Sequence, residues 1–171
     1  MNKIVKLTII AIVISVSISM LSTSLFSDGH NAPADTSKKV KKIGSLKGNT
    51  TAKTLSVEGS LPKFEVSAQT SGTLAGVEVT TMATYWAEMQ ANGTLYGECP
   101  NAGVIMAQDG VATFRASGTG SFTADGGTTF KGVVYVQTTA PSLASLNGAA
   151  LVYNWDVNAE GNATWELWEW K

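Results

Sequence analysis

Apolar and polar residues alternate with a period of two over much of the chain after residue 61. Between Ala149 and Val157, for example, apolar side chains occupy every second position, opposite Asn154 and Asp156. This alternation is typical of strands that bury one face and expose the other to water, and no amphipathic helical period appears beside it. It predicts strands near residues 64–69, 73–90, 94–98, 103–108, 111–119, 128–138, 146–157 and 163–170, with a bulge near residues 80–81.

Short turns rich in glycine separate these runs, at Asn92-Gly93, Asp109-Gly110, Asp125-Gly126-Gly127 and Glu160-Gly161-Asn162. Asn-Gly and Asp-Gly pairs readily take the positive φ angles of tight hairpins, so the strands should form an antiparallel meander. Seven or eight such strands lose their exposed edges when the sheet closes on itself. We therefore predict an all-β, up-and-down barrel of about eight strands, with a two-sheet sandwich as the alternative. The irregular loop from Thr138 to Ser145 is expected to form a lid or part of the mouth.

The first 27 residues follow a different pattern. Leu7 to Phe26 form a run of 20 residues without a charge, and Lys3 and Lys6 precede it. Such a segment predicts a hydrophobic helix that acts as a cleaved signal peptide or as a membrane anchor. Its length favours the anchor, whereas its many serine and threonine residues favour cleavage, so both remain open.

Residues 28–60 contain six lysines against three acidic residues, and no aromatic residue. A segment with so little apolar surface gains too little on burial to offset the entropy lost on ordering. It is therefore expected to be a flexible, lysine-rich linker in front of a β-barrel domain at residues 61–171. The lysines suggest an alternative role, which is contact with anionic lipid head groups.

Two signals disagree about the side of the membrane on which the domain lies. Four lysines between residues 38 and 42 follow the apolar segment, and the positive-inside rule would keep them in the cytoplasm. Glycosylation sequons begin at Asn49, Asn92 and Asn162 and favour the opposite side. We predict an extracytoplasmic domain, either anchored to the membrane or secreted, with the membrane contacted through the N-terminal segment.

The charge and the histidine content of residues 61–171 exclude several classes of function. Ten acidic residues outnumber four basic ones there, so no nucleic-acid partner is expected, because phosphate contacts need clustered cations. His30 is the only histidine of the chain, and Cys99 is the only cysteine. The domain therefore has no histidine-based nucleophile or metal site and no internal disulfide, and we expect no metal and no cofactor.

Carboxylates are the groups that remain for acid–base chemistry. Glu98 follows a tyrosine and a glycine, and Glu88 and Asp156 lie on strand faces that a barrel can turn inward. Two carboxylates at suitable separation can act on a small molecule or a glycan, which makes a carboxylate enzyme one hypothesis. The simpler interpretation is that these side chains are solvated or paired with Arg115 and Lys131.

Aromatic side chains support a different hypothesis, the binding of a small apolar or aromatic ligand. A barrel of about eight strands leaves room for one small ligand. The residues expected to line its interior or mouth are Tyr85, Tyr153, Trp155 and Trp168. Arg115 is the only arginine after residue 61 and is a candidate for anchoring an anionic ligand, with a cross-strand salt bridge as its alternative. A purely structural or interaction domain of the cell envelope is a third possibility.

The region from Gly93 to Lys171 also resembles a known group of proteins. The resemblance rests on Gly93-Thr94-Leu95-Tyr96-Gly97-Glu98, Gly118-Thr119-Gly120, Tyr135-Val136-Gln137-Thr138, Leu146-Asn147-Gly148 and Trp168-Glu169-Trp170-Lys171. These motifs resemble a group of small exported prokaryotic β-domain proteins whose plan is similar to calycin-like barrels, the lipocalin and allene-oxide-cyclase kind. The resemblance implies a barrel fold and carries over no catalytic residue.

Overall fold

The computed structural model describes residues 40–171, except Glu58 and Ser60. The expected N-terminal hydrophobic helix (residues 1–27) and the first part of the expected linker (residues 28–39) lie outside the described residues. No helix in the described part of the chain is long and apolar enough to cross a membrane.

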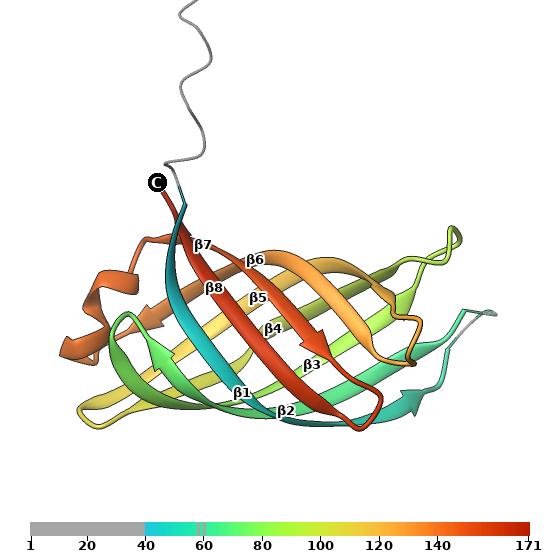
Figure 1. Cartoon of the computed structure of the whole chain (residues 1–171), viewed down its shortest axis with the longest axis horizontal. Coiled ribbons are helices and arrows are strands. Elements are labelled where there is room, and N and C mark those ends of the chain that lie inside the picture. Colours follow the sequence, from blue (N-terminus) through green and yellow to red (C-terminus); the bar gives the residue numbers. More distant parts are fainter. Residues whose placement is uncertain (1–39, 58, 60) are drawn as a thin grey trace, which may run out of the picture. The chain divides into compact units, whose positions relative to one another are not determined.

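Eight antiparallel strands form a closed barrel (Figure 1), in which each strand pairs with the next and β8 pairs back with β1. The prediction of an all-β, up-and-down barrel of about eight strands is confirmed. The strands are β1 (Val40–Leu55), β2 (Lys63–Leu74), β3 (Val77–Met89), β4 (Leu95–Ala107), β5 (Gly110–Phe122), β6 (Thr128–Thr138), β7 (Ala150–Val157) and β8 (Asn162–Trp170). One short 3-10 helix, η2 (Pro141–Leu146), connects β6 to β7.

The prediction that residues 28–60 form a linker is wrong for residues 40–55, which form the longest strand of the barrel. β1 pairs with both β2 and β8 and therefore closes the sheet. Few large apolar residues of β1 reach the core: Leu46 is fully buried, Ile43 at the bulge is partly buried, and most of the other inward positions hold glycine or threonine. A bulge between Lys42 and Gly44 also interrupts the alternation of apolar and polar residues in β1. The strand contains four lysines, which favoured the prediction of a linker.

Three further predictions about the strands differ from the structure. The expected run 73–90 contains a hairpin turn at Ala75 and Gly76, with φ angles of 52° and 82°. The prediction relied on Asn-Gly and Asp-Gly pairs, and this turn has neither. Alanine rarely takes a positive φ, so Ala75 gave no sign of a turn. The expected strands 94–98 and 103–108 are one strand, β4, interrupted by a bulge between Cys99 and Gly103. The bulge of β3 lies between Ala83 and Trp86 rather than at residues 80–81.

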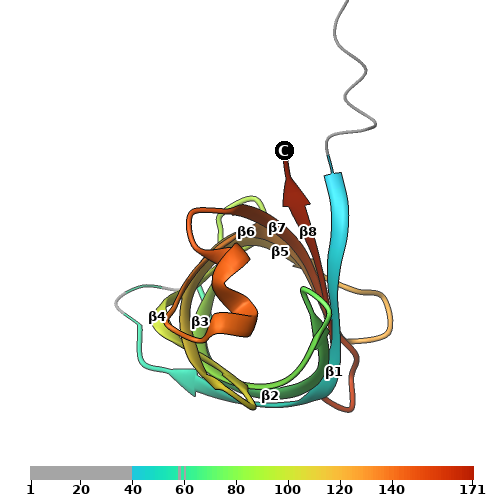
Figure 2. The same ribbon diagram turned by 90° about the vertical axis from the view of Figure 1, so that its left-hand side faces the viewer.

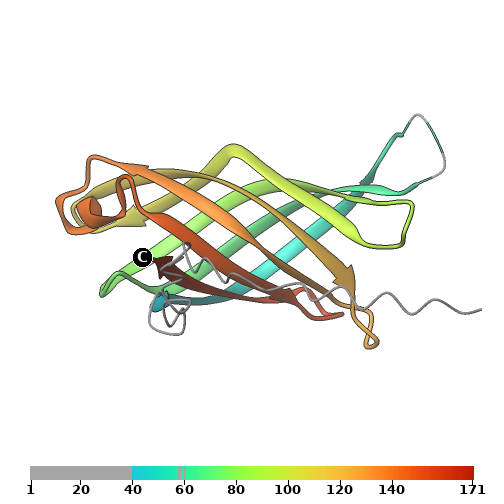
Figure 3. The ribbon, with the colours of Figure 1, turned by 90° about the horizontal axis from the view of Figure 1, so that it is seen from above.

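The two ends of the barrel differ. η2 lies across one end (Figure 2), where its Leu143 and Leu146 are buried in the core. Asp109 in the β4–β5 turn holds it in place by accepting hydrogen bonds from the backbone N–H and the hydroxyl of Ser142, at 2.8 and 2.6 Å. The loop expected to be a lid or part of the mouth is thus a plug that fills one end. The β5–β6 and β7–β8 turns lie at the opposite, open end (Figure 3).

Candidate functional site

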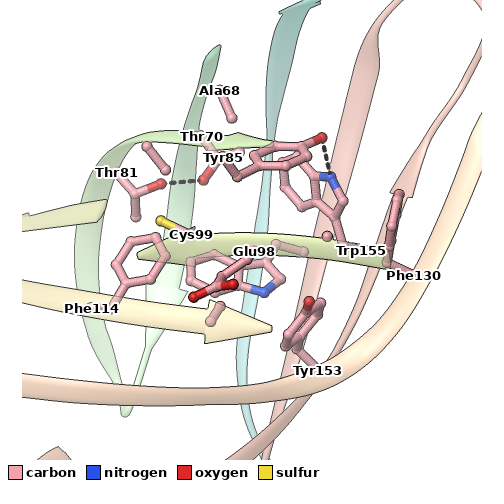
Figure 4. Close-up of a pocket in the computed structure, with 14 residues that line it drawn as sticks. Ala68, Thr70, Thr81, Tyr85, Glu98, Cys99, Phe114, Phe130, Tyr153 and Trp155 are labelled. Carbon is pink, nitrogen blue, oxygen red and sulfur yellow. Dashed lines mark hydrogen bonds between the residues drawn. The ribbon is translucent and has the colours of Figure 1, made fainter. Parts of the chain in front are cut away.

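An inner cavity of about 60 Å³ lies in the middle of the barrel, beyond the packed leucines of the plugged end. Its wall is almost entirely apolar and aromatic (Figure 4). The lining residues are Ala68, Thr70, Thr81, Ala83, Tyr85, Gly97, Glu98, Cys99, Phe114, Ala116, Phe130, Tyr153, Trp155 and Trp165. A space of this size accommodates one small chemical group and not a whole ligand.

Glycines on β4 and β5 make room for the aromatic rings that surround this cavity. A Cβ atom on Gly103 would lie 2.2 Å from the ring of Phe114, and one on Gly118 would lie 2.6 Å from the hydroxyl of Tyr153. Any larger residue at these positions would collide with a ring or force it to move. Glycine at these two positions therefore leaves the space that the ring of Phe114 and the hydroxyl of Tyr153 occupy.

The hydroxyl of Tyr85 is a polar group of the cavity wall that joins two of its aromatic side chains. Its oxygen accepts a hydrogen bond of 3.0 Å from Nε1 of Trp155, and the two rings meet edge to face (Figure 4). Burial raises the pKa of Tyr85 to about 12, and the hydrogen bond from Trp155 opposes this only in part. The hydroxyl is therefore neutral at physiological pH, and its own proton remains available for a hydrogen-bond acceptor.

Other groups in the wall are aromatic or have their polar atoms paired. Trp165 packs against Phe114, Tyr153 and Trp155, with ring centroids 5.1, 6.5 and 6.4 Å apart. Burial, followed by the proximity of Tyr85, raises the pKa of Tyr153 well above its ordinary value. The hydroxyls of Thr70 and Thr81 are buried and hydrogen-bond to each other at 2.7 Å. Cys99 is also buried, and burial raises the pKa of its thiol, which makes it a poor nucleophile.

A second, larger cavity of about 360 Å³ forms the mouth at the open end. Its apolar wall includes Phe64, Val66, Ala87, Leu95, Phe122 and Val157, and the β5–β6 and β7–β8 turns form its rim. Tyr85 and Phe130 line both this mouth and the inner cavity, so they stand between the two spaces. The volume falls within the range of small-molecule sites, roughly 300–1,000 Å³.

The three carboxylates proposed from the sequence do not point into the barrel. Although Glu98 borders the inner cavity, its side chain shares the outward face of β4 with Tyr96, whose hydroxyl lies 3.4 Å from its carboxylate. Glu88 forms an ion pair with Lys63 on the outer wall at 3.6 Å. Asp156 is exposed and accepts a hydrogen bond from Thr129 at 2.6 Å. They therefore form no pair of carboxylates around an enclosed substrate.

The aromatic candidates are only partly brought together. Tyr85, Tyr153 and Trp155 line the inner cavity, whereas Trp168 lies outside on the wall, between Lys42 of β1 and Val152 of β7. Arg115 is exposed and lies over the ring of Tyr135, 5.6 Å from its centroid, and it forms no ion pair with any described residue. Arg115 therefore contacts neither the cavity nor the mouth.

Sequence reasoning missed several aromatic residues of the site, namely Phe64, Phe114, Phe122, Phe130 and Trp165. The alternation of side chains along each strand indicated which face of the sheet these residues occupy. It did not indicate how far along the barrel axis they lie. The glycines opposite Phe114 and Phe130 were a usable signal, because a glycine in a strand often marks the close approach of another group. Within the described residues, no three His, Cys, Asp or Glu side chains are placed to hold a metal ion.

These features define a class of protein: an eight-stranded up-and-down β-barrel that is plugged at one end and hollow toward the other. The chain is similar to the crystal structure of a conserved protein of unknown function from Rhodopseudomonas palustris, with a TM-score of 0.64 and 10% sequence identity. The match covers 76% of this chain and 95% of that one. At this identity the likeness shows the fold alone. No known protein family and no curated protein sequence matches the chain.

Proposed function

We propose that the barrel binds one small apolar or aromatic ligand through its open end. The observation that carries the proposal is the 360 Å³ mouth with its apolar wall, which leads past Tyr85 and Phe130 to the aromatic inner cavity. A ligand in the mouth would bury its apolar surface against Phe64 and Phe122, of which Phe122 is 48% exposed without it. Its leading group would enter the inner cavity.

A calycin-like relationship, proposed from the sequence motifs, agrees with this function. The eight-stranded, up-and-down plan and the ligand-sized mouth are the features that support it. The carboxylate-enzyme hypothesis receives no comparable support, since Glu98, Glu88 and Asp156 all project from the outer wall.

We also propose that the domain lies outside the cytoplasmic membrane. The side chains of Asn49, Asn92 and Asn162, which begin the three sequons, are all exposed on the barrel. Protease added to intact cells with their wall removed is expected to digest an epitope placed after Lys171. Protection of that epitope would place the domain in the cytoplasm.

Binding can be tested with residues 35–171, which contain all eight strands and η2. N-phenyl-1-naphthylamine, a neutral aromatic probe, should bind this fragment and gain fluorescence. In Ala52→Trp the new indole enters the mouth, because Ala52 lines it, and probe binding should fall at least about tenfold, a loss of about 1.4 kcal/mol.

Thr51→Trp is the matched control, because Thr51 neighbours Ala52 on β1 and is exposed outside the mouth. It should bind the probe as the parent fragment does. Circular dichroism establishes that both variants retain the sheet. Equal affinities for Ala52→Trp and Thr51→Trp would contradict the proposal.

A further inference from the structure

An apolar patch lies on the outer wall at the end of the barrel where β1 begins. We call it the entry patch; it consists of Val40, Ala150, Val152, Trp168 and Trp170. In the sheet register, Val40, Trp170 and Ala150 are direct neighbours across β1, β8 and β7. Lys42, Trp168 and Val152 form the next row. Trp170 is 59% exposed and Val40 is 46% exposed, so two large apolar side chains lie side by side in solvent.

The entry patch ends sharply at the third row, which is polar. That row consists of Ser45, Glu166 and Asn154. Glu166 accepts a hydrogen bond of 2.7 Å from Ser45 and forms an ion pair with Lys42. The outer wall thus changes from aromatic to polar within three rows of one sheet. A surface that meets a lipid–water boundary has this gradient, because indole rings favour the interfacial layer while ion pairs favour water.

Positive charge surrounds the entry patch. Lys41 is exposed next to it, and Lys38 and Lys39 directly precede Val40 in the sequence. Lys42 and Lys171 carry two further charges, which Glu166 and Glu169 balance. Within residues 38–42 and 166–171, which flank the entry patch in the sequence, five basic residues exceed two acidic ones by three. This local excess favours a negatively charged partner at the patch, although Asp109 is a further acidic residue of the plugged end.

The chain outside the described structure indicates what that partner is. Thirteen residues, 27–39, lie between the uncharged run from Leu7 to Phe26 and Val40. Those residues span at most about 45 Å when fully extended. Figures 1 and 2 show the start of β1 beside the end of β8, so the short connection joins the barrel at the entry patch itself.

We propose that the entry patch docks onto an anionic lipid bilayer, with Trp168 and Trp170 in the interfacial layer. This inference rests on the proposed position outside the cytoplasmic membrane and on the alternative in which the N-terminal segment stays as a membrane anchor. The short connection would keep the patch at a high effective concentration over the lipid, so that even weak contacts are occupied. The plugged end then faces the bilayer, and the mouth opens away from it.

The test uses the full chain reconstituted with vesicles of phosphatidylcholine and phosphatidylglycerol. Flotation in a density gradient first reports whether the chain is attached to lipid. Lipids brominated near the headgroup end of one acyl chain then quench tryptophans that lie in the interfacial layer. The double variant Trp168→Phe/Trp170→Phe should lose most of this quenching while it still floats. Trp86→Phe, which removes an outward tryptophan of β3 distant from the entry patch, should keep it.

The two proposals fail in different ways. A chain that floats, but whose quenching is the same in the double variant as in Trp86→Phe, would overturn the docking and leave the attachment intact. A chain that does not float would overturn the attachment and the docking together. Trp170→Glu provides a second variant, in which the anionic headgroups repel the new carboxylate, so the quenching of the remaining Trp168 should fall; Trp168 quenching equal to that of Trp170→Phe counts against the docking.

Discussion

Tyr85 is the residue on which the polar character of the site depends. Its hydroxyl accepts the only hydrogen bond that the structure gives to the indole N–H of Trp155, and it separates the mouth from the inner cavity. Strand alternation was sufficient to place Tyr85 on the inward face of the sheet. The pairing with Trp155 could not be predicted, because it joins residues 70 positions apart and depends on the order in which the strands close the barrel.

The raised pKa of Tyr85 makes stability depend on pH in the alkaline range. The folded protein holds the Tyr85 proton up to about pH 12, whereas the unfolded chain releases it near the ordinary tyrosine pKa of 10.0. The contribution of the protonated Tyr85 to the free energy of unfolding is therefore complete below pH 10. It is lost as the pH rises toward 12, by up to about 1.4 kcal/mol per pH unit. Tyr85→Phe lacks this contribution, so its destabilisation relative to the parent protein should shrink over the same range.

Urea unfolding of the parent protein, Tyr85→Phe and Tyr135→Phe between pH 9 and 12 checks this expectation. Tyr135 is 48% exposed, and its substitution controls for the loss of a solvent-facing tyrosine. Below pH 10, Tyr85→Phe should cost about 1–3 kcal/mol because Nε1 of Trp155 loses its acceptor. A pH-independent difference between the parent and Tyr85→Phe would show that burial does not control this hydroxyl.

At the scale of elements, the plug formed by η2 determines which end of the barrel is open. The sequence indicated that residues 138–145 are irregular, but it could not show that Leu143 in this segment and Leu146 just after it turn inward. β1 was missed for a related reason, since a strand that pairs on both sides is stabilised by its neighbours and needs little apolar surface of its own. Hairpins with an Asn-Gly or Asp-Gly signature were predicted well, whereas the Ala75-Gly76 turn, which lacks one, was not.

The plug should contribute measurably to stability. Leu143 is fully buried, so Leu143→Ala is expected to lower the free energy of unfolding by about 2–5 kcal/mol. Ser145→Ala changes an exposed residue of the same helix and should have an effect within about 0.5 kcal/mol. Chemical denaturation of both variants measures the difference. Similar midpoints for the two variants would mean that η2 is not packed as a plug.

At the scale of the whole molecule, the two ends of the barrel have separate roles in this account. The plugged end carries the entry patch, and the open end carries the mouth. Composition predicts no histidine chemistry in the barrel and no nucleic-acid partner, but it could not divide the barrel into a filled and a hollow half. That division depends on which inward positions hold leucine and which hold glycine or alanine opposite an aromatic ring. It becomes visible only when the strand register is known.

The most direct test of the account is an amide NMR titration of residues 35–171 with N-phenyl-1-naphthylamine. The central claim is that the open end binds one small aromatic molecule. The largest shifts should therefore fall on Tyr85, Phe130 and the β5–β6 and β7–β8 turns, with one-to-one saturation and little change at Leu143 and Leu146. Shifts confined to the plugged end or the outer wall, or none at saturating probe, would contradict that claim.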